Sequence, residues 1–307
     1  MILSCGEALI DMLPRISTLG EASFAPYAGG AVFNTAMALG RLGAPSGFFS
    51  GVSNDMLGEI LADTLATSGV DTSLCARSDR PTTVAFVKLV NGQATYAFYD
   101  EGTAGRMLAL SDLPVLGDEV EVVFVGGISL VNDPAASTYE ALQAREAPLR
   151  VTMIDPNIRP GFIAGKEAEY RARIERMVAR ADIVKLSDED LHWLEGEGDL
   201  VGLARGILAK GPKVVFITEG AAGARAVTAT QDRFVAAQKV VVVDTVGAGD
   251  TFNAGVLAAL HQAGALSKAR VAGLSDAELD SALSLGTRAA AVTVSRAGAN
   301  PPWASEL

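Results

Sequence analysis

Asp250 stands directly after a glycine-rich turn, Gly247-Ala248-Gly249, in the segment DTVGAGDTFNAG that spans residues 244–255. The apolar run Val240–Asp244 before it predicts a β-strand, and the stretch Phe252 to Gly264 predicts a helix. This arrangement places free backbone N–H groups and the positive end of a helix dipole in front of a ligand. Such donors suit a phosphate, and a carboxylate among them suits a base that takes a proton from an alcohol. The segment therefore favours transfer of a phosphoryl group to a hydroxyl.

The same residues argue against two other nucleotide-binding loops. The dinucleotide fingerprint G-x-G-x-x-G needs a third glycine, but Phe252 occupies that position, and no acidic residue follows on a second strand at the usual distance. This pattern disfavours an NAD-dependent dehydrogenase. The phosphate loop G-x-x-x-x-G-K-[ST] is absent from the sequence. A turn that binds nothing is the structural alternative, but it leaves the acid in the turn unexplained.

The composition excludes several classes of protein. The chain has 307 residues, 49% of them apolar, so it can bury a large core, and its net charge of −11 disfavours nucleic acid as a partner. Cys5 and Cys75 suit neither a disulfide framework nor a zinc site. No secretory signal or membrane span is expected, so we predict a cytoplasmic protein without membrane contact. His192 and His261 have no neighbouring residues at the spacing of a metal site or of a nucleophile–base pair. We therefore expect carboxylates to act in any acid–base catalysis.

Apolar strands and amphipathic helices alternate from about residue 120 onward, as in a parallel sheet covered on both faces. We therefore expect one α/β domain over residues 1–307, with a doubly wound, mostly parallel sheet flanked by helices. The expected strands are Val120–Val125, Arg150–Ile154, Ile183–Leu186, Val214–Thr218 and Val240–Asp244, and the expected helices include Glu167–Ala181, Leu200–Ala209 and Asp276–Val292.

The first third of the chain predicts a separate small sheet. Asn91-Gly92 lies between two β runs, Thr83–Leu89 and Ala94–Tyr99, which is a strong indication of a hairpin. An antiparallel hairpin does not belong inside a βαβ series, so we expect a small antiparallel sheet completed by segments between Ala8 and Ala28. The alternative is a hairpin on the edge of the main sheet.

A second glycine-rich segment, GGAVFNTAMALGRLG, spans residues 29–43. Gly29 and Gly30 allow the backbone to approach a ligand closely, and Asn34 falls in the first turn of the helix that follows. Together with the segment around Asp250, it resembles the two signatures of the ribokinase-like sugar kinases, the phosphofructokinase-B type family. The resemblance extends from Ile2 to Asn300.

The resemblance implies a role for each of these segments. Asp250 corresponds to the general base, the turn at Gly247, Ala248 and Gly249 to an anion hole, and the small sheet, residues 8–28 and 82–106, to a lid over the sugar. In some members of the family the lid is also the dimer contact. The sugar contacts implied are Asp11, Gly29, Gly30, Asn34, Arg106 and, in the segment DPNIR, Asn157 and Arg159.

On the nucleotide side, the resemblance implies contacts from Lys185, Ser187, Thr218, Gly220 and Gly223. The segment KLSDED, residues 185–190, stands where the family usually has N-x-x-E, so Asp190 corresponds to a residue that orders a water on Mg²⁺. The same four residues, Ser187 to Asp190, also suit a capping box at the start of a helix, and both readings stay open.

Asp244, Val246 and Gly298 match positions around the potassium site of some family members. Pro302 stands where ribokinase-like sequences often carry serine, and this departure weakens the inference of a potassium site.

We therefore expect an ATP-dependent sugar kinase that uses Mg²⁺, with K⁺ as a further candidate and a homodimer through the lid left open. Fructose is the expected substrate, because DPNIR, DEGTAGRML and SDEDL look most like bacterial fructokinases. The alternatives are 2-keto-3-deoxygluconate, whose carboxylate needs a cation such as Lys88, Arg80 or Arg106, and then ribose. A sugar-binding regulator without catalysis is the alternative from another class, and the intact Asp250 and glycine turn disfavour it.

Overall fold

The computed structural model describes residues 1–90 and 93–307, and the side chains outside residues 88–96. A nine-stranded sheet has the order β15-β14-β13-β12-β11-β10-β1-β4-β6. Strands from β13 to β6 are parallel, and β14 and β15 join antiparallel at one edge. The strands are β1 (Ile2–Cys5), β4 (Ser46–Phe49), β6 (Val70–Asp71), β10 (Val122–Gly126), β11 (Val151–Asp155), β12 (Ile183–Ser187), β13 (Val214–Thr218), β14 (Gly223–Val227) and β15 (Asp232–Ala236).

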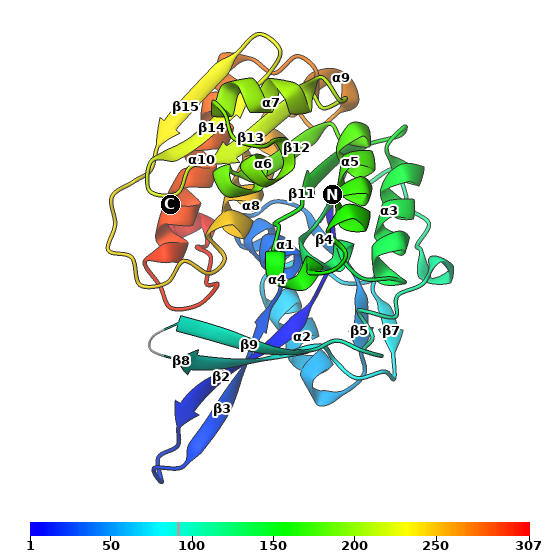
Figure 1. The fold of residues 1–307 in the computed structure, drawn as a ribbon, viewed down its shortest axis with the longest axis vertical. Helices are drawn as coiled ribbons and strands as arrows, with labels where there is room; N and C mark the ends of the chain where they lie inside the picture. The colour runs from blue at the N-terminus through cyan, green and yellow to red at the C-terminus, as the bar shows by residue number, and fades with distance from the viewer. Residues whose placement is uncertain (91–92) are drawn as a thin grey trace.

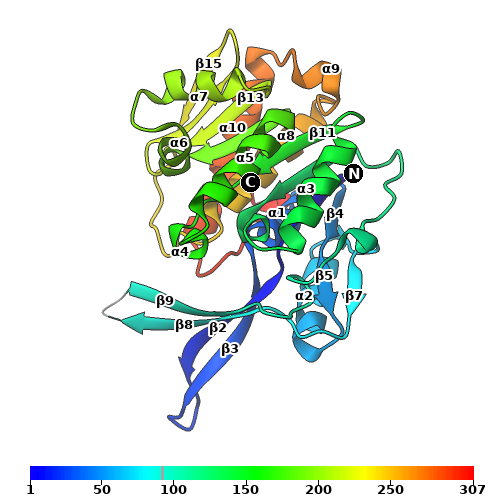
Figure 2. The same cartoon turned by 45° about the vertical axis from the view of Figure 1, so that its right-hand side comes forward.

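Helices cover both faces of this sheet (Figures 1 and 2). On one face pack α1 (Ala31–Arg41), α8 (Ala248–Gln262) and α10 (Asp276–Val294), and on the other pack α3 (Ala135–Glu146), α5 (Glu167–Arg180), α6 (Asp188–Glu195) and α7 (Leu200–Leu208). Successive strand residues alternate between the two layers, so that Val122 and Phe124 join one core and Val123 and Val125 the other. The expected doubly wound, mostly parallel sheet is confirmed. The helices predicted over 167–181, 200–209 and 276–292 are present within two residues of their predicted bounds, whereas the helix predicted over 252–264 is α8 and begins earlier, at Ala248.

The remaining elements lie outside this arrangement of the main sheet and its principal helices. They are α2 (Met56–Thr67), α4 (Pro160–Ile163), α9 (Lys268–Val271), the strands β5 (Gly51–Ser53) and β7 (Ala76–Ser78), and three 3₁₀ segments, Leu110–Asp112, Gly127–Leu130 and Ala304–Glu306. β5 and β7 pair with each other in a sheet of their own. No helix in the described part of the chain is long and apolar enough to span a membrane.

A second sheet projects from the body of the molecule (Figures 1 and 2), and we call it the lid region after its predicted role, which stays a prediction. It contains β2 (Leu9–Ile16), β3 (Ala22–Gly29), β8 (Val84–Val90) and β9 (Gln93–Tyr99), in the order β3-β2-β8-β9. The predicted small sheet is therefore confirmed, although its central pair, β2 and β8, is parallel, so the sheet is mixed. Asn91-Gly92, the predicted turn, lies outside the described residues.

One predicted strand, Val240–Asp244, is wrong. The sheet ends at β15, and the valines that follow form an irregular segment between β15 and α8. Val241 is 82% exposed, and its neighbours Val240 and Val242 line a cleft instead of a core. β-branched residues favour an extended backbone, but in the described structure no strand pairs with this segment, and β15 is the last strand of the sheet.

Candidate active site

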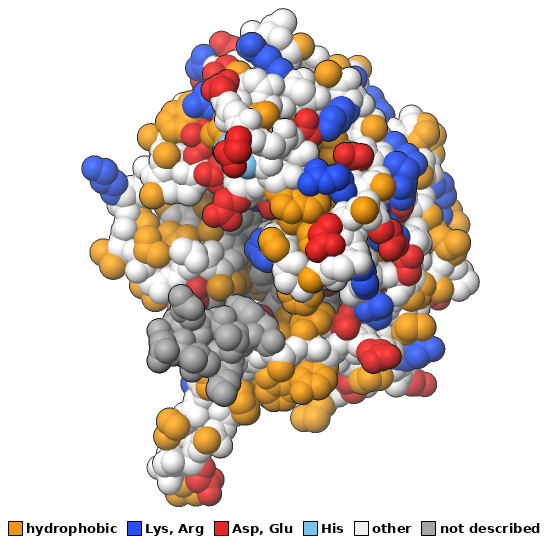
Figure 3. Space-filling model, in the orientation of Figure 1, with side chains coloured by type: hydrophobic (Ala, Val, Ile, Leu, Met, Phe, Trp, Pro, Cys, Tyr) orange, Lys and Arg blue, Asp and Glu red, His pale blue; other side chains and the backbone are white. Residues whose placement is uncertain are grey.

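A cleft of about 1280 Å³ opens at the carboxyl ends of the parallel strands, between the body and the lid region. Figure 3 shows the surface hollowed at this place. Open α/β sheets bind ligands at this edge. Most of the predicted site residues line the cleft: Asp11, Gly30, Asn34, Asn157, Arg159, Lys185, Ser187, Asp190, Thr218, Gly220, Gly223, Val246, Gly247, Ala248, Gly249 and Asp250.

Asp250 lies in the first turn of α8 with its carboxylate buried at the floor of the cleft. Its Oδ2 atom accepts a hydrogen bond of 2.9 Å from Nδ2 of Asn34, and its carbonyl oxygen accepts one of 3.2 Å from the hydroxyl of Thr35. The two glycine-rich segments of the sequence therefore meet at Asp250. Burial raises the pKa of Asp250 to about 7, while the bond from Asn34 opposes the rise. A carboxyl group with this pKa can accept a proton near neutral pH.

The glycine turn exposes the amide groups of the first turn of α8. Gly247 is the N-cap residue, has a left-handed φ of 79°, and provides no side-chain cap. A Cβ there would lie 2.8 Å from Cβ of Ala299, so both conformation and space require glycine. The amide groups of Gly249 and Asp250 consequently have no side-chain cap, as an anion hole requires, while the Ala248 N–H donates to the carbonyl oxygen of Thr245 at 3.3 Å.

Behind this turn lies a buried ion pair that the sequence did not reveal. Nζ of Lys185, in the middle of β12, lies 3.0 Å from Oδ2 of Asp155, at the end of β11. The same oxygen accepts a bond of 2.7 Å from Nδ2 of Asn253 on α8. A Cβ built on Gly249 would lie 3.0 Å from Nζ of Lys185, so the ammonium group sits against the anion hole.

Asp190 forms the predicted capping box at the start of α6. Its backbone N–H donates to Oγ of Ser187 at 3.0 Å, and its Oδ2 accepts from the Ser187 N–H at 3.3 Å. Its other oxygen accepts from the Ile158 N–H at 3.0 Å. Burial and the neighbouring Asp155 raise the pKa of Asp190. The capping interpretation is therefore confirmed, and a role toward Mg²⁺ stays a prediction.

Asp11 brings a second carboxylate into the cleft from the lid region. It lies on β2, and burial raises its pKa to about 6. Gly29, on the paired strand β3, does not line the cleft but makes room for this carboxylate, because a Cβ at Gly29 would lie 2.6 Å from Oδ2 of Asp11. Gly29 thus leaves room for the carboxylate of Asp11, and its contact with a ligand stays a prediction.

Glu7 is the site residue that our sequence analysis missed. Its buried carboxylate follows β1, accepts from the Ala31 N–H at 2.8 Å, and so caps α1. The other oxygen accepts from the Ser129 N–H at 3.2 Å, and a Cβ on Gly127 would lie 2.2 Å from the carboxylate. Burial raises the pKa of Glu7. An acid immediately after an apolar strand, in CGEALID, was the available indication.

Two residues of the segment DPNIR, Asn157 and Arg159, line the cleft. Asn157 lines the cleft with a φ of 46°, and its N–H donates to Oδ1 of Asp155 at 3.1 Å. Arg159 is exposed at the rim. Arg106 does not line the cleft: its Nη1 pairs with Asp100 at 2.8 Å, and its Nε donates to the carbonyl oxygen of Asp133 at 2.8 Å. The structure therefore does not bring Arg106 to the predicted sugar site.

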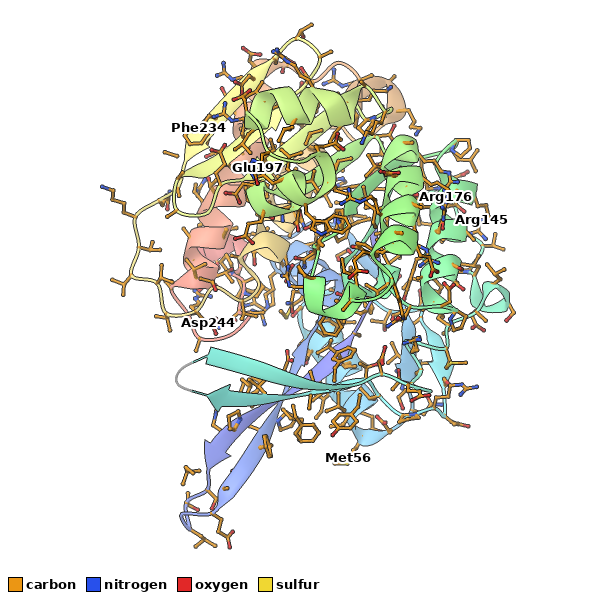
Figure 4. The ribbon with its side chains drawn as sticks, viewed as in Figure 1. Met56, Arg145, Arg176, Glu197, Phe234 and Asp244 are labelled. Atoms are coloured by element: carbon orange, nitrogen blue, oxygen red, sulfur yellow. The ribbon has the colours of Figure 1, made fainter. Side chains whose placement is uncertain are left out.

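The three residues of the predicted potassium site lie together. The carboxylate of Asp244 accepts from the Val246 N–H and from the Gly298 N–H, both at 3.0 Å. Figure 4 shows Asp244 on the loop between β15 and α8, next to the segment that follows α10. The carboxylate thus joins two loops beside the anion hole, and a bound cation stays a prediction. In the described residues, no three His, Cys, Asp or Glu side chains converge as metal ligands.

Comparison with known proteins agrees with this geometry. The profile of the pfkB family of carbohydrate kinases matches residues 1–306, so the chain belongs to this family. A fructokinase of Rhizobium leguminosarum bv. trifolii is 60% identical over 279 residues, which cover 91% of this chain and 85% of the relative. The chain is therefore a carbohydrate kinase of the ribokinase-like fold, as the sequence predicted.

Solved structures support the same assignment. The fructokinase of Xylella fastidiosa with bound ATP superposes with a TM-score of 0.86 at 27% identity, over 97% of this chain and 93% of that one. A double mutant of the fructokinase of Vibrio cholerae O395, with fructose, ADP and potassium ion bound, gives a TM-score of 0.84 at 27% identity, with the same coverage of both chains.

Proposed function

We propose that this protein is an ATP-dependent fructokinase that transfers the γ-phosphoryl group to a primary hydroxyl of fructose. The observation that carries the proposal is the buried carboxylate of Asp250, beside the uncapped amide groups of α8 and at the floor of the cleft. The 60% identity to a fructokinase favours fructose among the sugars.

Asp250 acts as the general base. In its ionised form it takes the proton from the sugar hydroxyl while that oxygen attacks the γ-phosphorus, and the bond to the bridging oxygen of ADP breaks. Asn34 donates to Oδ2 and holds the carboxylate in place. The amide groups of Gly249 and Asp250 stabilise the negative charge on the phosphoryl group in transfer. Lid residues around the sugar exclude water, which limits hydrolysis of ATP.

We propose that Mg²⁺ binds mainly through the phosphates of ATP, where it supplies neutralising charge. Asp190 is already engaged by two backbone N–H groups, so it suits contact with the metal through water. The side chains of Asp188 and Glu189 also line the cleft beside it. We assign Thr218, Gly220 and Gly223, with Ser187 and Lys185, to the nucleotide side, and Asp244, Val246 and Gly298 to a potassium site.

The charges on the sugar side favour a neutral sugar over 2-keto-3-deoxygluconate. Asp11 and Glu7 both line this part of the cleft, and two carboxylates repel the carboxylate of a sugar acid. Arg106 is held by Asp100, and the side chain of Lys88 lies outside the described residues. The cationic side chains that line the described cleft are Arg159, Lys185 and Lys239, none of them on the lid.

The lid region also suits a contact between two copies of the chain. Ile16, Leu19, Phe24, Tyr27 and Tyr99 are exposed on it, and apolar residues in this number favour a partner surface. We propose a homodimer in the cytoplasm, and light scattering coupled to size exclusion tests the oligomeric state.

The direct test is ADP release from Mg-ATP with fructose, 2-keto-3-deoxygluconate, ribose and adenosine. We expect turnover on fructose in the parent, none above background in Asp250→Asn, and parental turnover in Asp63→Asn, an exposed aspartate of α2. Turnover on another sugar keeps Asp250 as base and replaces the substrate. An Asp250→Asn variant as active as the parent refutes the mechanism, and no turnover on any sugar favours a binding protein.

A further inference from the structure

The chain that follows α10 packs against the glycine turn at the start of α8. The Gly298 N–H donates to Oδ2 of Asp244 at 3.0 Å, and a Cβ built on Gly247 would lie 2.8 Å from Cβ of Ala299. Gly247 is the N-cap residue of α8, so Ala299 fills the space directly beside the turn. The position of the turn therefore depends on residues 298–303, which we call the C-terminal segment.

Arg41, in the last turn of α1, holds the C-terminal segment from the other side. Its Nη1 atom donates to Oδ1 of Asn300 at 2.8 Å and to the carbonyl oxygen of Pro301 at 2.9 Å. Its guanidinium group lies 5.4 Å from the centre of the Trp303 ring, within the range of a cation–π contact. Its Nε atom donates to Oγ of Ser68 at 3.2 Å, which fixes the side chain. One arginine therefore contacts three residues of the C-terminal segment.

The C-terminal segment is stiff enough to carry this constraint to the turn. Pro301 and Pro302 are buried, and their rings fix the backbone angle φ. The Asn300 N–H donates to the carbonyl oxygen of Gly298 at 2.9 Å, which closes a tight turn around Ala299. A displacement of Pro301 should therefore also displace Ala299, which lies against Gly247.

Both ends of α1 thus support the first turn of α8. At the N-terminal end of α1, Nδ2 of Asn34 donates to Oδ2 of Asp250 at 2.9 Å. At the other end, Arg41 reaches the same turn through the C-terminal segment. A catalytic site that must be held within a fraction of an ångström needs such support from residues around it. Arg41 itself does not line the cleft.

We propose that Arg41 is a positioning residue for phosphoryl transfer, which holds the C-terminal segment against Gly247 and so keeps the amide groups of Gly249 and Asp250 in place. This role rests on the proposed kinase function. Loss of Arg41 should lower kcat, because the amide groups act on charge that develops in the transition state. It should leave KM for fructose nearly unchanged, since the groups that Arg41 contacts belong to the body of the molecule and not to the lid region.

The first test compares the steady-state kinetics of Arg41→Met with those of the parent, Arg41→Lys and Arg205→Met. Arg205 is an exposed arginine in the last turn of α7 and serves as the matched control. In Arg41→Met we expect kcat to fall about tenfold to 10²-fold, as for a small misplacement of catalytic groups, and KM for fructose to stay within about twofold of the parent. Arg41→Lys should recover part of kcat, because an ammonium group keeps the charge but lacks the planar fork. Arg205→Met should match the parent.

Hydrogen–deuterium exchange separates a positioning role from local support of the C-terminus. In Arg41→Met we expect faster exchange of the amide groups in residues 244–250 as well as in residues 298–307. Support of the C-terminus alone would leave residues 244–250 unchanged. The amide groups of β11 and β12 report on global stability and should exchange as in the parent. Trp303→Leu keeps the hydrogen bonds of Arg41 and should show the same pattern more weakly, so it replaces Arg41→Met if that variant does not fold.

Two results overturn the proposal. One is exchange at the parental rate in residues 244–250, and the other is a kcat of Arg41→Met within about threefold of the parent, too small for a misplaced catalytic group. Failure of the kinase function gives a different result. A parent without turnover on any sugar refutes that function, whereas exchange in residues 244–250 still tests the role of Arg41.

Discussion

The transfer region and the lid region each bring a carboxylate to the same cleft, but in different surroundings. In the transfer region, which is the first turn of α8 with the ends of β11 and β12, Asp250 is held by Asn34, and Asp155 by Lys185 and Asn253. In the lid region, Asp11 makes no hydrogen bond among the side chains that the structure describes, and it is only half-buried. The transfer region is therefore organised before substrates bind, whereas Asp11 has unused acceptor sites suited to sugar hydroxyls.

This difference means that the two regions should fail in different ways when they are altered. Damage to the transfer region should lower kcat, because it removes interactions made in the transition state. Damage to the lid region should raise KM for the sugar, because it removes contacts made on binding.

The largest expected effect is in the transfer region. Asp250→Asn should lower kcat by about 10²–10⁴-fold, the range for a lost general base. The same variant should unfold at a higher temperature at pH 8, because the pKa of Asp250 is raised from 3.8 to about 7. The folded state then binds the proton more tightly than the unfolded state, and stability is lost as pH rises from about 4 to 7.

Thermal unfolding at pH 5 and pH 8 measures this second effect. The advantage of Asp250→Asn over the parent should shrink at pH 5, where the parent is protonated. An advantage that is equal at both pH values would contradict the raised pKa.

Glu7 supports the transfer region indirectly, through the helix that carries Asn34, and its alteration should have the next largest effect. Its carboxylate holds the start of α1, which carries Asn34, and the turn at Ser129. Glu7→Gln replaces one acceptor by a donor that faces a backbone N–H, which costs about 1–3 kcal/mol. We expect kcat/KM to fall about tenfold or more and the unfolding temperature to drop. Glu59→Gln, at an exposed site on α2, is the control.

The pH profile separates a positioning role of Glu7 from a purely structural one. The charge of Glu7 raises the pKa of Asp250, so Glu7→Gln should move the acid limb of kcat to lower pH. If Glu7→Gln lowers the unfolding temperature but leaves the acid limb of the kcat profile unchanged, Glu7 has only a structural role.

The sequence predicted the elements of this site better than their contacts. Local patterns predicted the alternating strands and helices, the small second sheet, the capping box at Ser187 and the turn before Asp250, because each of these patterns involves residues close together in the sequence. The valines before Asp244 were misread, since whether an extended segment pairs depends on a distant sheet edge. Glu7 and the Lys185–Asp155 pair depend on strands that meet only in the folded chain.

The smallest expected effect is in the lid region and comes from Asp11. Asp11→Asn should raise KM for fructose about tenfold, since a hydrogen bond to a charged group contributes about 1.5–3 kcal/mol, and kcat should change less. Steady-state kinetics at pH 8 measures both constants. A fall in kcat as large as that of Asp250→Asn, with KM unchanged, would remove the distinction between the two regions.

In the unmutated protein, KM for fructose and kcat should depend on pH in different ranges. The pKa of Asp11 is raised to about 6, so the carboxylate that accepts bonds from sugar hydroxyls is lost as pH falls through about 6, and KM for fructose should rise there. The pKa of Asp250 is about 7, so as the pH is lowered kcat should begin to fall near pH 7, before KM begins to rise near pH 6. In Asp11→Asn the rise in KM should disappear while the decline in kcat remains, because the two carboxylates titrate in different regions of the cleft. If both trends persist unchanged in that variant, Asp11 does not bind the sugar.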